Sequence, residues 1–367
     1  MQESIIWVGL DVHKDSITAA MFTDDSDKGE IIRLTGEVKS VRRLFRRLEK
    51  RGAIRSCYEA SSCGYSLCRA LQRDGFHCEV IAPCLIPRIP GNRHKTDRID
   101  ASNLAKLLRS GHLTTVRVPD ESQEAVRGLV RLRYSCSERV KATKQRICSF
   151  TLRDGLVFRE TKTYWTRKHR CWLRDLHQSL SPPQSTTLGI ELNHLEYLET
   201  QLRSLDLEID RYAQRDPYRE TVDALCCLKG VRTLTAMILA TEIGDVSRFP
   251  SARSLMAWTG LVPRERSSGN REWRGWITKC GNRHVRRILV ESAWNHTRGR
   301  RATAEIRRRR MGKDPVVVGI AVRAQHRLQR RVMALGLRKH QNVAVTAVAR
   351  EMAGFVWAIM RAVPQTV

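Results

Sequence analysis

A continuous run of apolar residues near the start of the chain, residues 5–10, places the strongest constraint on the fold. A strand of this kind is buried on both faces, so it requires helices above and below a sheet. The segments that follow predict a three-stranded meander and then helices alternating with strands, which is a mixed α/β arrangement. The predicted strands are 5–10, 17–22, 31–34, 53–58 and 75–81, and the predicted helices are 41–51 and 64–74.

Four acidic residues are predicted to meet at one edge of this sheet. Asp11 ends the first strand and Glu59 ends the fourth. Asp97 and Asp100 stand three residues apart at the start of a predicted helix, which puts both on one helix face. If the two strands are neighbours and the helix packs across their ends, the four carboxylates repel one another unless divalent cations lie between them. Mg²⁺ prefers oxygen ligands, and two such ions can hold both sides of a phosphodiester.

Each of these acids also has a simpler interpretation. An aspartate near a helix N-terminus favours the helix dipole, and Thr96 can serve as the N-cap of that helix. Asp11 can cap a turn, and Glu59 can be an exposed strand end. The coincidence of all four near one predicted edge is what favours a metal site.

The chain is strongly basic, with 66 Lys and Arg against 38 Asp and Glu and a formal net charge of +28 over 367 residues. A folded protein with this excess binds a polyanion, and nucleic acid is the first expectation. No long apolar span or signal-peptide pattern is recognised, so we expect no membrane partner and a cytoplasmic, nucleoid-associated location. The eleven cysteines form no C-x-x-C pair, which predicts reduced and mostly buried thiols.

The length and the patterns predict three parts: an α/β domain over 1–120, a helical linker over 121–218 and a mostly α-helical domain over 219–367. In the linker, apolar residues recur at steps of three and four through 129–150 and 195–212, which is coiled-coil spacing. The opposite face of the first helix is basic. The linker is therefore either a plain spacer or a dimerising arm that also follows a nucleic-acid backbone.

Gly230, followed by an apolar stretch over 233–243, predicts a helix-hairpin-helix element in the C-terminal domain. Glycine allows a tight turn, and the N-terminus of the next helix offers free N–H groups to a phosphate. A simple helix C-cap at Gly230 is the alternative. The basic run 298–310 is either a solvated charge run or a phosphate-binding surface, and residues 311–340 carry no pattern that predicts a role.

Ser267 and Ser268, directly before Gly269, lie in very basic surroundings. A serine needs activation to attack phosphorus, and guanidinium groups would stabilise the charge that develops. Taken alone, however, Ser-Ser-Gly predicts an ordinary loop that exposes its hydroxyl groups.

Three segments of the first domain resemble the signatures of the DEDD-type insertion-sequence transposases, a family of bridge-RNA-guided recombinases related to the pilin-gene invertase. The segments are Gly9-Leu10-Asp11-Val12-His13-Lys14, Tyr58-Glu59-Ala60-Ser61 and Lys95-Thr96-Asp97-Arg98-Ile99-Asp100-Ala101. In the last domain, the segments 260–263, 268–269, 277–279 and 281–282 are similar to the transposase domain of the same family.

The resemblance implies a RuvC-like (RNase H-like) fold for 1–120, with Asp11, Glu59, Asp97 and Asp100 as a metal-binding tetrad. It implies a coiled-coil linker over 121–218, and a serine of the loop as a DNA nucleophile. Ser268, the one before the glycine, fits that role best, and Ser267 stays open because the doubled serine blurs the register.

The function implied is a transposase or recombinase of a mobile insertion sequence that cleaves and rejoins DNA strands. Its cofactor would be Mg²⁺, as two ions, or Mn²⁺. Its partners would be donor and target double-stranded DNA, a structured guide RNA and further copies of the chain, as a homodimer or a dimer of dimers. The candidate nucleic-acid contacts are Lys95, Arg98, Gly230, Arg264, Arg266, Arg271, Arg274, Lys279, Arg283, Arg286 and Arg287.

Two other functions remain open from the sequence. A metal-dependent nuclease of the Holliday-junction-resolvase type would need the four acids and the metal, but no serine. A non-catalytic nucleic-acid-binding protein would use the same acids only as helix and turn caps.

Overall fold

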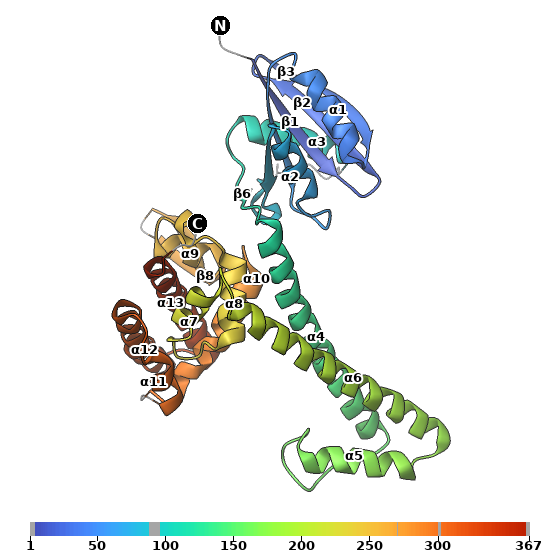
Figure 1. Cartoon of the computed structure of the whole chain (residues 1–367), viewed down its shortest axis with the longest axis vertical. Helices are drawn as coiled ribbons and strands as arrows, with labels where there is room; N and C mark the ends of the chain where they lie inside the picture. Colours follow the sequence, from blue (N-terminus) through green and yellow to red (C-terminus); the bar gives the residue numbers. More distant parts are fainter. Residues whose placement is uncertain (1–3, 88–95, 270, 300–301, 365–367) are drawn as a thin grey trace. The chain divides into compact units, whose positions relative to one another are not determined.

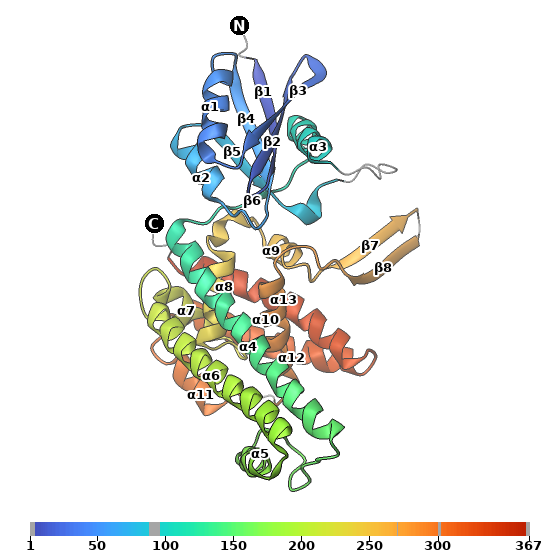
Figure 2. The same cartoon turned by 90° about the vertical axis from the view of Figure 1, so that its right-hand side faces the viewer.

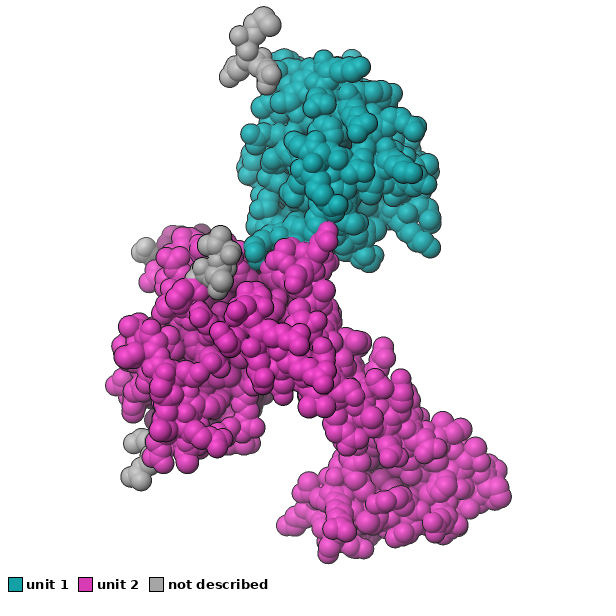
Figure 3. Space-filling model, in the orientation of Figure 1, with its two compact units in different colours: residues 1–119 teal, residues 120–367 magenta. Residues whose placement is uncertain are grey.

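The structure, a computed structural model, describes residues 4–87, 96–269, 271–299 and 302–364. The chain forms two compact units, residues 1–119 and 120–367, which Figure 3 colours separately. Each unit has a hydrophobic core of its own. The finer division of the second unit into a linker over 121–218 and a domain over 219–367 stays a prediction.

The first unit is built on a six-stranded mixed sheet (Figures 1 and 2). The strand order is β3-β2-β1-β4-β5-β6, in which β1, β2 and β3 form an antiparallel meander. β4 runs parallel to β1, β5 parallel to β4, and β6 antiparallel to β5. The strands are β1 (Ile5–Val12), β2 (Ser16–Thr23), β3 (Ser26–Thr35), β4 (Ala53–Glu59), β5 (His77–Ile81) and β6 (Thr115–Val116).

Helices cover both faces of this sheet, as Figure 2 shows. On one face, α1 (Val38–Leu48) and α2 (Ser66–Arg73) pack their apolar sides against β1, β2 and β4. On the other face, α3 (Asp97–Arg109) buries Leu104 and Leu108 against the sheet. The fully buried positions of β1 therefore have helices above and below them, as the apolar run predicts.

Two details of the sheet differ from the sequence-based prediction. The sequence predicts a third strand over 31–34, but β3 already begins at Ser26. That part of β3 lies at the edge of the sheet, where polar side chains face solvent and leave no apolar alternation to recognise. β6 is not predicted at all, because its two residues, Thr115 and Val116, carry no pattern of their own and pair with Ile81 and Val80 only in the folded chain.

A long helical arm begins the second unit. α4 (Glu121–Arg153) and α6 (Pro182–Ala213) pack along one another, and α5 (Arg167–Ser179) packs near the far end of the pair (Figure 1). The shared apolar stripe contains Cys136, Val140, Ile147, Leu188, Leu195 and Leu198. Side chains cap the N-termini of two of these helices. Asp120 accepts a hydrogen bond from the Gln123 amide of α4, and Thr166 caps α5.

The rest of the second unit is a helical domain that carries one two-stranded hairpin, β7–β8 (Figure 2). Its core is formed chiefly by α8, α10, α12 and α13. The elements are α7 (Arg219–Leu225), α8 (Thr233–Ile243), α9 (Ala252–Trp258), β7 (Pro263–Ser268), β8 (Arg271–Ile277), α10 (Arg283–Ala293), α11 (Ala304–Arg310), α12 (Pro315–Gly336) and α13 (Gln341–Ala362).

The apolar helix α13 differs from the expectation that the chain contains no long apolar span. By length and composition it could cross a membrane, although no such span is recognised in the sequence. Its residues Val345, Val348, Met352 and Val356 are completely buried among the other helices, so α13 serves here as a core helix. All eleven cysteines are free, and five of them are buried.

Candidate active site

Asp11 and Glu59 leave the sheet from the same face. β1 and β4 are parallel neighbours, and Leu10 is paired with Tyr58 immediately before the two acids. Side chains of paired residues in adjacent strands point the same way, so the residues that follow them do so too. This is the face that α3 covers, because the Cys57 thiol lies 3.8 Å from the Leu104 carbonyl oxygen of that helix.

The start of α3 brings two further acids to this edge. Thr96 caps the helix by accepting a hydrogen bond from the Ile99 amide at 3.3 Å, as the capping pattern predicts. Asp97 and Asp100 both lie in the first helical turn. The helix approaches β1 closely because Gly9 has no side chain; a Cβ at this position would collide with the Ala101 carbonyl oxygen.

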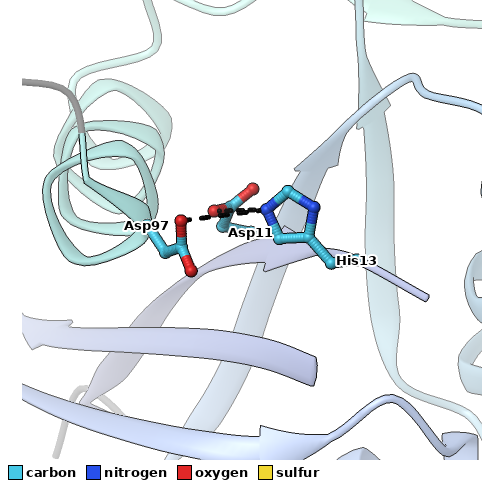
Figure 4. A group of neighbouring side chains, drawn as sticks. All are labelled: Asp11, His13 and Asp97. Carbon is cyan, nitrogen blue, oxygen red and sulfur yellow. Dashed lines mark hydrogen bonds and ion pairs between the residues drawn. The ribbon is translucent and has the colours of Figure 1, made fainter. Parts of the chain in front are cut away.

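Three side chains meet at this point, as Figure 4 shows. The His13 Nε2 atom lies 3.2 Å from Asp11 Oδ2 and 3.9 Å from Asp97 Oδ1. One ligand atom of each residue lies within 4.8 Å of the other two. The structure thus brings Asp11 and Asp97 together. Asp100 acts on Asp11 electrostatically, whereas Glu59 is exposed and lies outside this group of three.

His13 has no role assigned from sequence, although it lies within the first motif. A usable signal was present: Asp11 and His13 are two residues apart, the spacing that puts two side chains of an extended chain on one face. The histidine is exposed beside partly buried Asp11, where it can donate to the carboxylate or offer a ring nitrogen to a cation.

The electrostatics of Asp11 favour a cation at this place. Burial raises the pKa of Asp11 above its usual value, and the neighbouring Asp97 and Asp100 carboxylates raise the pKa further, while His13 partly offsets both effects. The charged carboxylate is therefore under-compensated in the protein alone. A donor set of carboxylate oxygens with one imidazole suits Mg²⁺ or Mn²⁺, so the residues present fit a divalent metal.

The two serines lie at the tip of the β7–β8 hairpin rather than in the irregular loop predicted for them. Ser268 is paired with Arg271, and Gly269 begins the turn with a φ of 57°. Ser267 is paired with Glu272, and Arg266 with Trp273. Because alternate residues of a strand face opposite sides, the two hydroxyl groups point to different faces of the hairpin.

Those two faces differ in charge. The side that carries Ser268 also carries Arg266, Arg271 and Trp273, all of them exposed. On the other side, the Ser267 hydroxyl donates a hydrogen bond to Glu265 at 3.0 Å, and Glu272 lies opposite. The hydroxyl of Ser268 therefore has basic and aromatic neighbours, while that of Ser267 has acidic ones.

An ion pair between a completely buried carboxylate and an exposed arginine lies next to the base of this hairpin. The Glu242 carboxylate is completely buried, and both of its oxygens accept hydrogen bonds from the Arg131 guanidinium, at 2.6 and 2.8 Å. Asn282 donates to the same carboxylate at 2.7 Å and caps α10 through the amides of His284 and Val285. Burial alone would raise the pKa of Glu242, but Arg131 and Asn282 outweigh it and the pKa lies below its usual value.

The predicted nucleic-acid contacts have different surroundings. Arg286 donates a hydrogen bond to the Thr259 carbonyl. Arg287 forms an ion pair with Glu291 and lies over the Tyr134 ring. Gly230 has a φ of 87° and packs against α10 and the turn after it. Gly230 does form the turn between α7 and α8. Lys95 and the Arg274 side chain lie outside the described residues. The exposed members are Arg98, Arg264, Arg266, Arg271, Lys279 and Arg283.

Comparison with known proteins gives a consistent result. Residues 8–153 match the family of DEDD transposases of the IS110 type, and residues 222–308 match the family described as transposase IS116/IS110/IS902. The y4qE protein of Sinorhizobium fredii, which is named as a transposase, is 38% identical to this chain over 98% of this chain and 90% of the y4qE sequence. The transposase for insertion sequence element IS1533 of Leptospira borgpetersenii is 33% identical over 89% of this chain and 95% of its own.

The chain belongs to the IS110/IS116 family of DEDD transposases. It is therefore a DNA transposase of an insertion sequence, and an enzyme rather than a non-catalytic binding protein. The match over 8–153 includes all four predicted acids of this transposase, and the match over 222–308 includes both serines.

Proposed function

We propose that this transposase cleaves and rejoins DNA strands with Asp11, Glu59, Asp97 and Asp100 as metal ligands and Ser268 as the nucleophile. The observation that carries the proposal is the convergence of Asp11, His13 and Asp97, whose ligand atoms lie within 4.8 Å of one another although strand and helix are far apart in sequence. A RuvC-like (RNase H-like) fold for residues 1–120 is part of this proposal. It is supported by the meander β3-β2-β1 followed by parallel β4 and β5.

Asp11 and Asp97 would hold the metal, with Asp100 one helical turn further along α3 and Glu59 leaving the same sheet face as Asp11. Divalent cations bound there would polarise the oxygens of the scissile phosphate. Mg²⁺ as two ions, or Mn²⁺, fits the carboxylates, and His13 would add an imidazole at the edge of the set.

Ser268 would attack the phosphorus atom of the scissile phosphodiester. The bond between Ser268 Oγ and phosphorus forms while the bond from phosphorus to the deoxyribose oxygen breaks. The serine proton leaves to a base, and the departing oxygen takes up a proton. One phosphoester bond replaces another, so the reverse attack rejoins the strand without an energy source. Arg266 and Arg271, on the same face of the hairpin, would stabilise the charge that develops.

The acids and the serine belong to different units of the chain. We infer that the active complex is a homodimer or a dimer of dimers, in which the helical arm acts as a coiled-coil linker and the site combines residues of two protomers. Donor and target double-stranded DNA would be the substrates, at the nucleoid in the cytoplasm. A structured guide RNA would supply sequence recognition by base pairing, while a protein with a net charge of +28 contacts backbones.

Single substitutions in a plasmid recombination assay test the roles of these residues. We expect Asp11→Asn, Asp97→Asn and Ser268→Ala to reduce recombination by at least about 10³-fold, the effect of removing a metal ligand or a nucleophile. Asp15→Asn, an exposed acid in the turn after β1, and Ser267→Ala are the matched controls and should keep activity within a few-fold. Denaturing gels should show a covalent protein–DNA adduct that Ser268→Ala abolishes.

The same gels separate this function from its main alternative. A resolvase-type nuclease would cut DNA with Ser268→Ala and form no adduct. Full recombination by Ser268→Ala, or loss of the adduct with Ser267→Ala instead, would contradict the assignment of Ser268. Normal recombination by Asp11→Asn would remove the metal site from the reaction.

A further inference from the structure

The sequence predicts no role for residues 311–340, yet one face of α12 lines a hollow of about 680 Å³ against α11. The volume lies within the range of pockets that enclose a single small ligand. Arg307 and Arg310 of α11 and His326, Gln329 and Arg330 of α12 contribute to its wall. None of these residues belongs to the acidic cluster or to the serine hairpin.

The wall of this hollow is cationic. It contains three guanidinium groups and one imidazole, and no carboxylate among the described residues. Arg310 is fixed in place, since it donates to the Cys227 carbonyl at 2.9 Å and to the Gln325 side chain at 3.1 Å. Arg307 and Arg330 are exposed and make no ion pair within the part of the chain that the structure describes. They are therefore available to an anion.

A largely buried amide side chain, that of Gln329, gives the hollow a group that can recognise a ligand. Gln329 is only 7% exposed, lines the hollow and makes no hydrogen bond to any described residue. The Gln329 amide atoms are not among the sealed polar atoms of the core, so they are accessible to a ligand in the hollow. Val322 and Met333, both exposed, add an apolar rim next to the amide.

We propose that this hollow holds one unpaired nucleotide of a nucleic-acid strand. Arg307 and Arg330 would bind its phosphate, since guanidinium groups match phosphate oxygens in geometry and charge. The base would lie against Val322 and Met333 with its edge on the Gln329 amide, because amide side chains pair with base edges and extruded bases are read in such pockets. A continuous duplex would contact the arginines through its phosphates, but it would have no use for the Gln329 amide or the apolar rim. These two features therefore favour an unpaired nucleotide over a duplex.

Binding of short hairpin oligonucleotides to the full-length protein tests this site. Fluorescence anisotropy compares a fully paired stem with a stem that has one unpaired nucleotide, in DNA and in RNA versions, and with an abasic residue at that position. We expect the unpaired nucleotide to strengthen binding by about tenfold in at least one of the two nucleic acids, and the abasic form to lose most of that gain. The better of the two versions identifies the source of the nucleotide.

Matched variants assign the effect to the hollow. Gln329→Leu and Arg330→Gln should remove the preference for the unpaired form and leave binding to the paired stem within about twofold. Arg323→Gln removes the same charge from an exposed position of α12 outside the hollow and should leave the preference unchanged. Thermal melting checks the fold of each variant, and Gln329→Glu provides a second, charge-based test because it should repel the phosphate.

Equal binding of the paired, unpaired and abasic forms would overturn the proposal. So would equal losses with Arg323→Gln and Arg330→Gln, since these would show general attraction to a polyanion rather than a site. Neither result bears on the acidic cluster or on Ser268, whose tests use recombination and adduct formation.

Discussion

Gly9 shows how one residue can set the geometry of the acidic cluster. It lies two residues before Asp11 on β1, under the part of α3 that follows Asp97 and Asp100. Any side chain at this position would meet the Ala101 carbonyl oxygen and the Ala105 amide nitrogen of the helix backbone. The backbone of a helix cannot move aside as easily as the end of a flexible side chain. The short distance between β1 and α3 therefore requires glycine at this position.

Replacing Gly9 with alanine should push α3 away from β1. We expect Gly9→Ala to lower the free energy of unfolding by about 1–3 kcal/mol, the cost of overpacking, and to weaken Mn²⁺ binding as Asp97 moves from Asp11. Denaturant unfolding and calorimetric titration of Mn²⁺ measure the two effects. Gly128→Ala is the control, because an open position within α4 should gain up to about 1 kcal/mol from alanine. Equal stability of the two variants would contradict this account.

At the scale of elements, the serine hairpin depends on its base. Asn282 links the Glu242–Arg131 pair to the start of α10, directly after the hairpin, and Arg286 of the same helix holds the Thr259 carbonyl on the chain that enters it. These contacts join α4, α8 and α10 at the point where the hairpin leaves the domain.

Removing the charge of Glu242 should destabilise the second unit, because its carboxylate is completely buried and hydrogen-bonded. We expect Glu242→Gln to lower the free energy of unfolding of the second unit by about 1–3 kcal/mol, since the hydrogen bonds from Arg131 and Asn282 to a charged carboxylate are weakened. Glu291→Gln removes an exposed partner of Arg287 and should cost at most about 1 kcal/mol. Denaturant unfolding compares the two. A double variant with Arg131→Gln should recover part of the loss; no recovery would mean that the pair is not the cause.

The helical arm contains a second ion-pair group, which makes its stability depend on pH. Glu199 of α6 accepts hydrogen bonds from Arg170 at 2.8 and 3.0 Å and from Lys144 at 2.8 Å. The Arg170 hydrogen bonds, helped by Lys144 and opposed by burial, lower the pKa of Glu199 to about 2. A lowered carboxyl pKa stabilises the folded arm at pH values above the unfolded pKa, and this contribution is lost as the pH falls from about 4.5 towards 2.

Glu199→Gln should therefore destabilise the arm at pH 7 by about 1–3 kcal/mol, the value of hydrogen bonds to a charged group. The difference from the parent protein should shrink as the pH falls below about 4.5. Amide hydrogen exchange in α5 measures it at each pH. Glu196→Gln, an exposed acid of the same helix, should show little effect at any pH. A difference that stays constant down to pH 3 would show that the carboxylate is not what stabilises the arm.

At the scale of the whole molecule, the sequence predicted most of the first unit and much less of the second. The apolar run of β1, the acid that ends β4 and the capping pattern at Thr96 are local signals, and each is found where it was predicted. The approach of Asp11 to Asp97 could also be inferred, because neighbouring strands and one covering helix leave few arrangements. Their roles as metal ligands stay predictions.

The remaining features depend on contacts between distant residues. Arg131 and Glu242 pair across the fold, and no local pattern marks either as the partner of the other. β7 is polar and exposed, and the exposed tryptophans of β8, Trp273 and Trp276, do not alternate with polar residues, so no apolar alternation predicts the two strands. His13 gave only a spacing signal, and the hollow on α12 has no sequence signature because α11 supplies its other wall.

The position of the serines at the tip of a two-stranded ribbon affects when their hydroxyl groups are held in one orientation. A lone hairpin gains little stability in water from its own contacts. Among the described residues, no third strand pairs with β7–β8, and Trp276 is 82% exposed. A nucleic acid that lay against the ribbon would therefore restrict the orientation of a hydroxyl group carried there. If Ser268 is the nucleophile, as we propose, its attack on DNA would be favoured only once the DNA is in place.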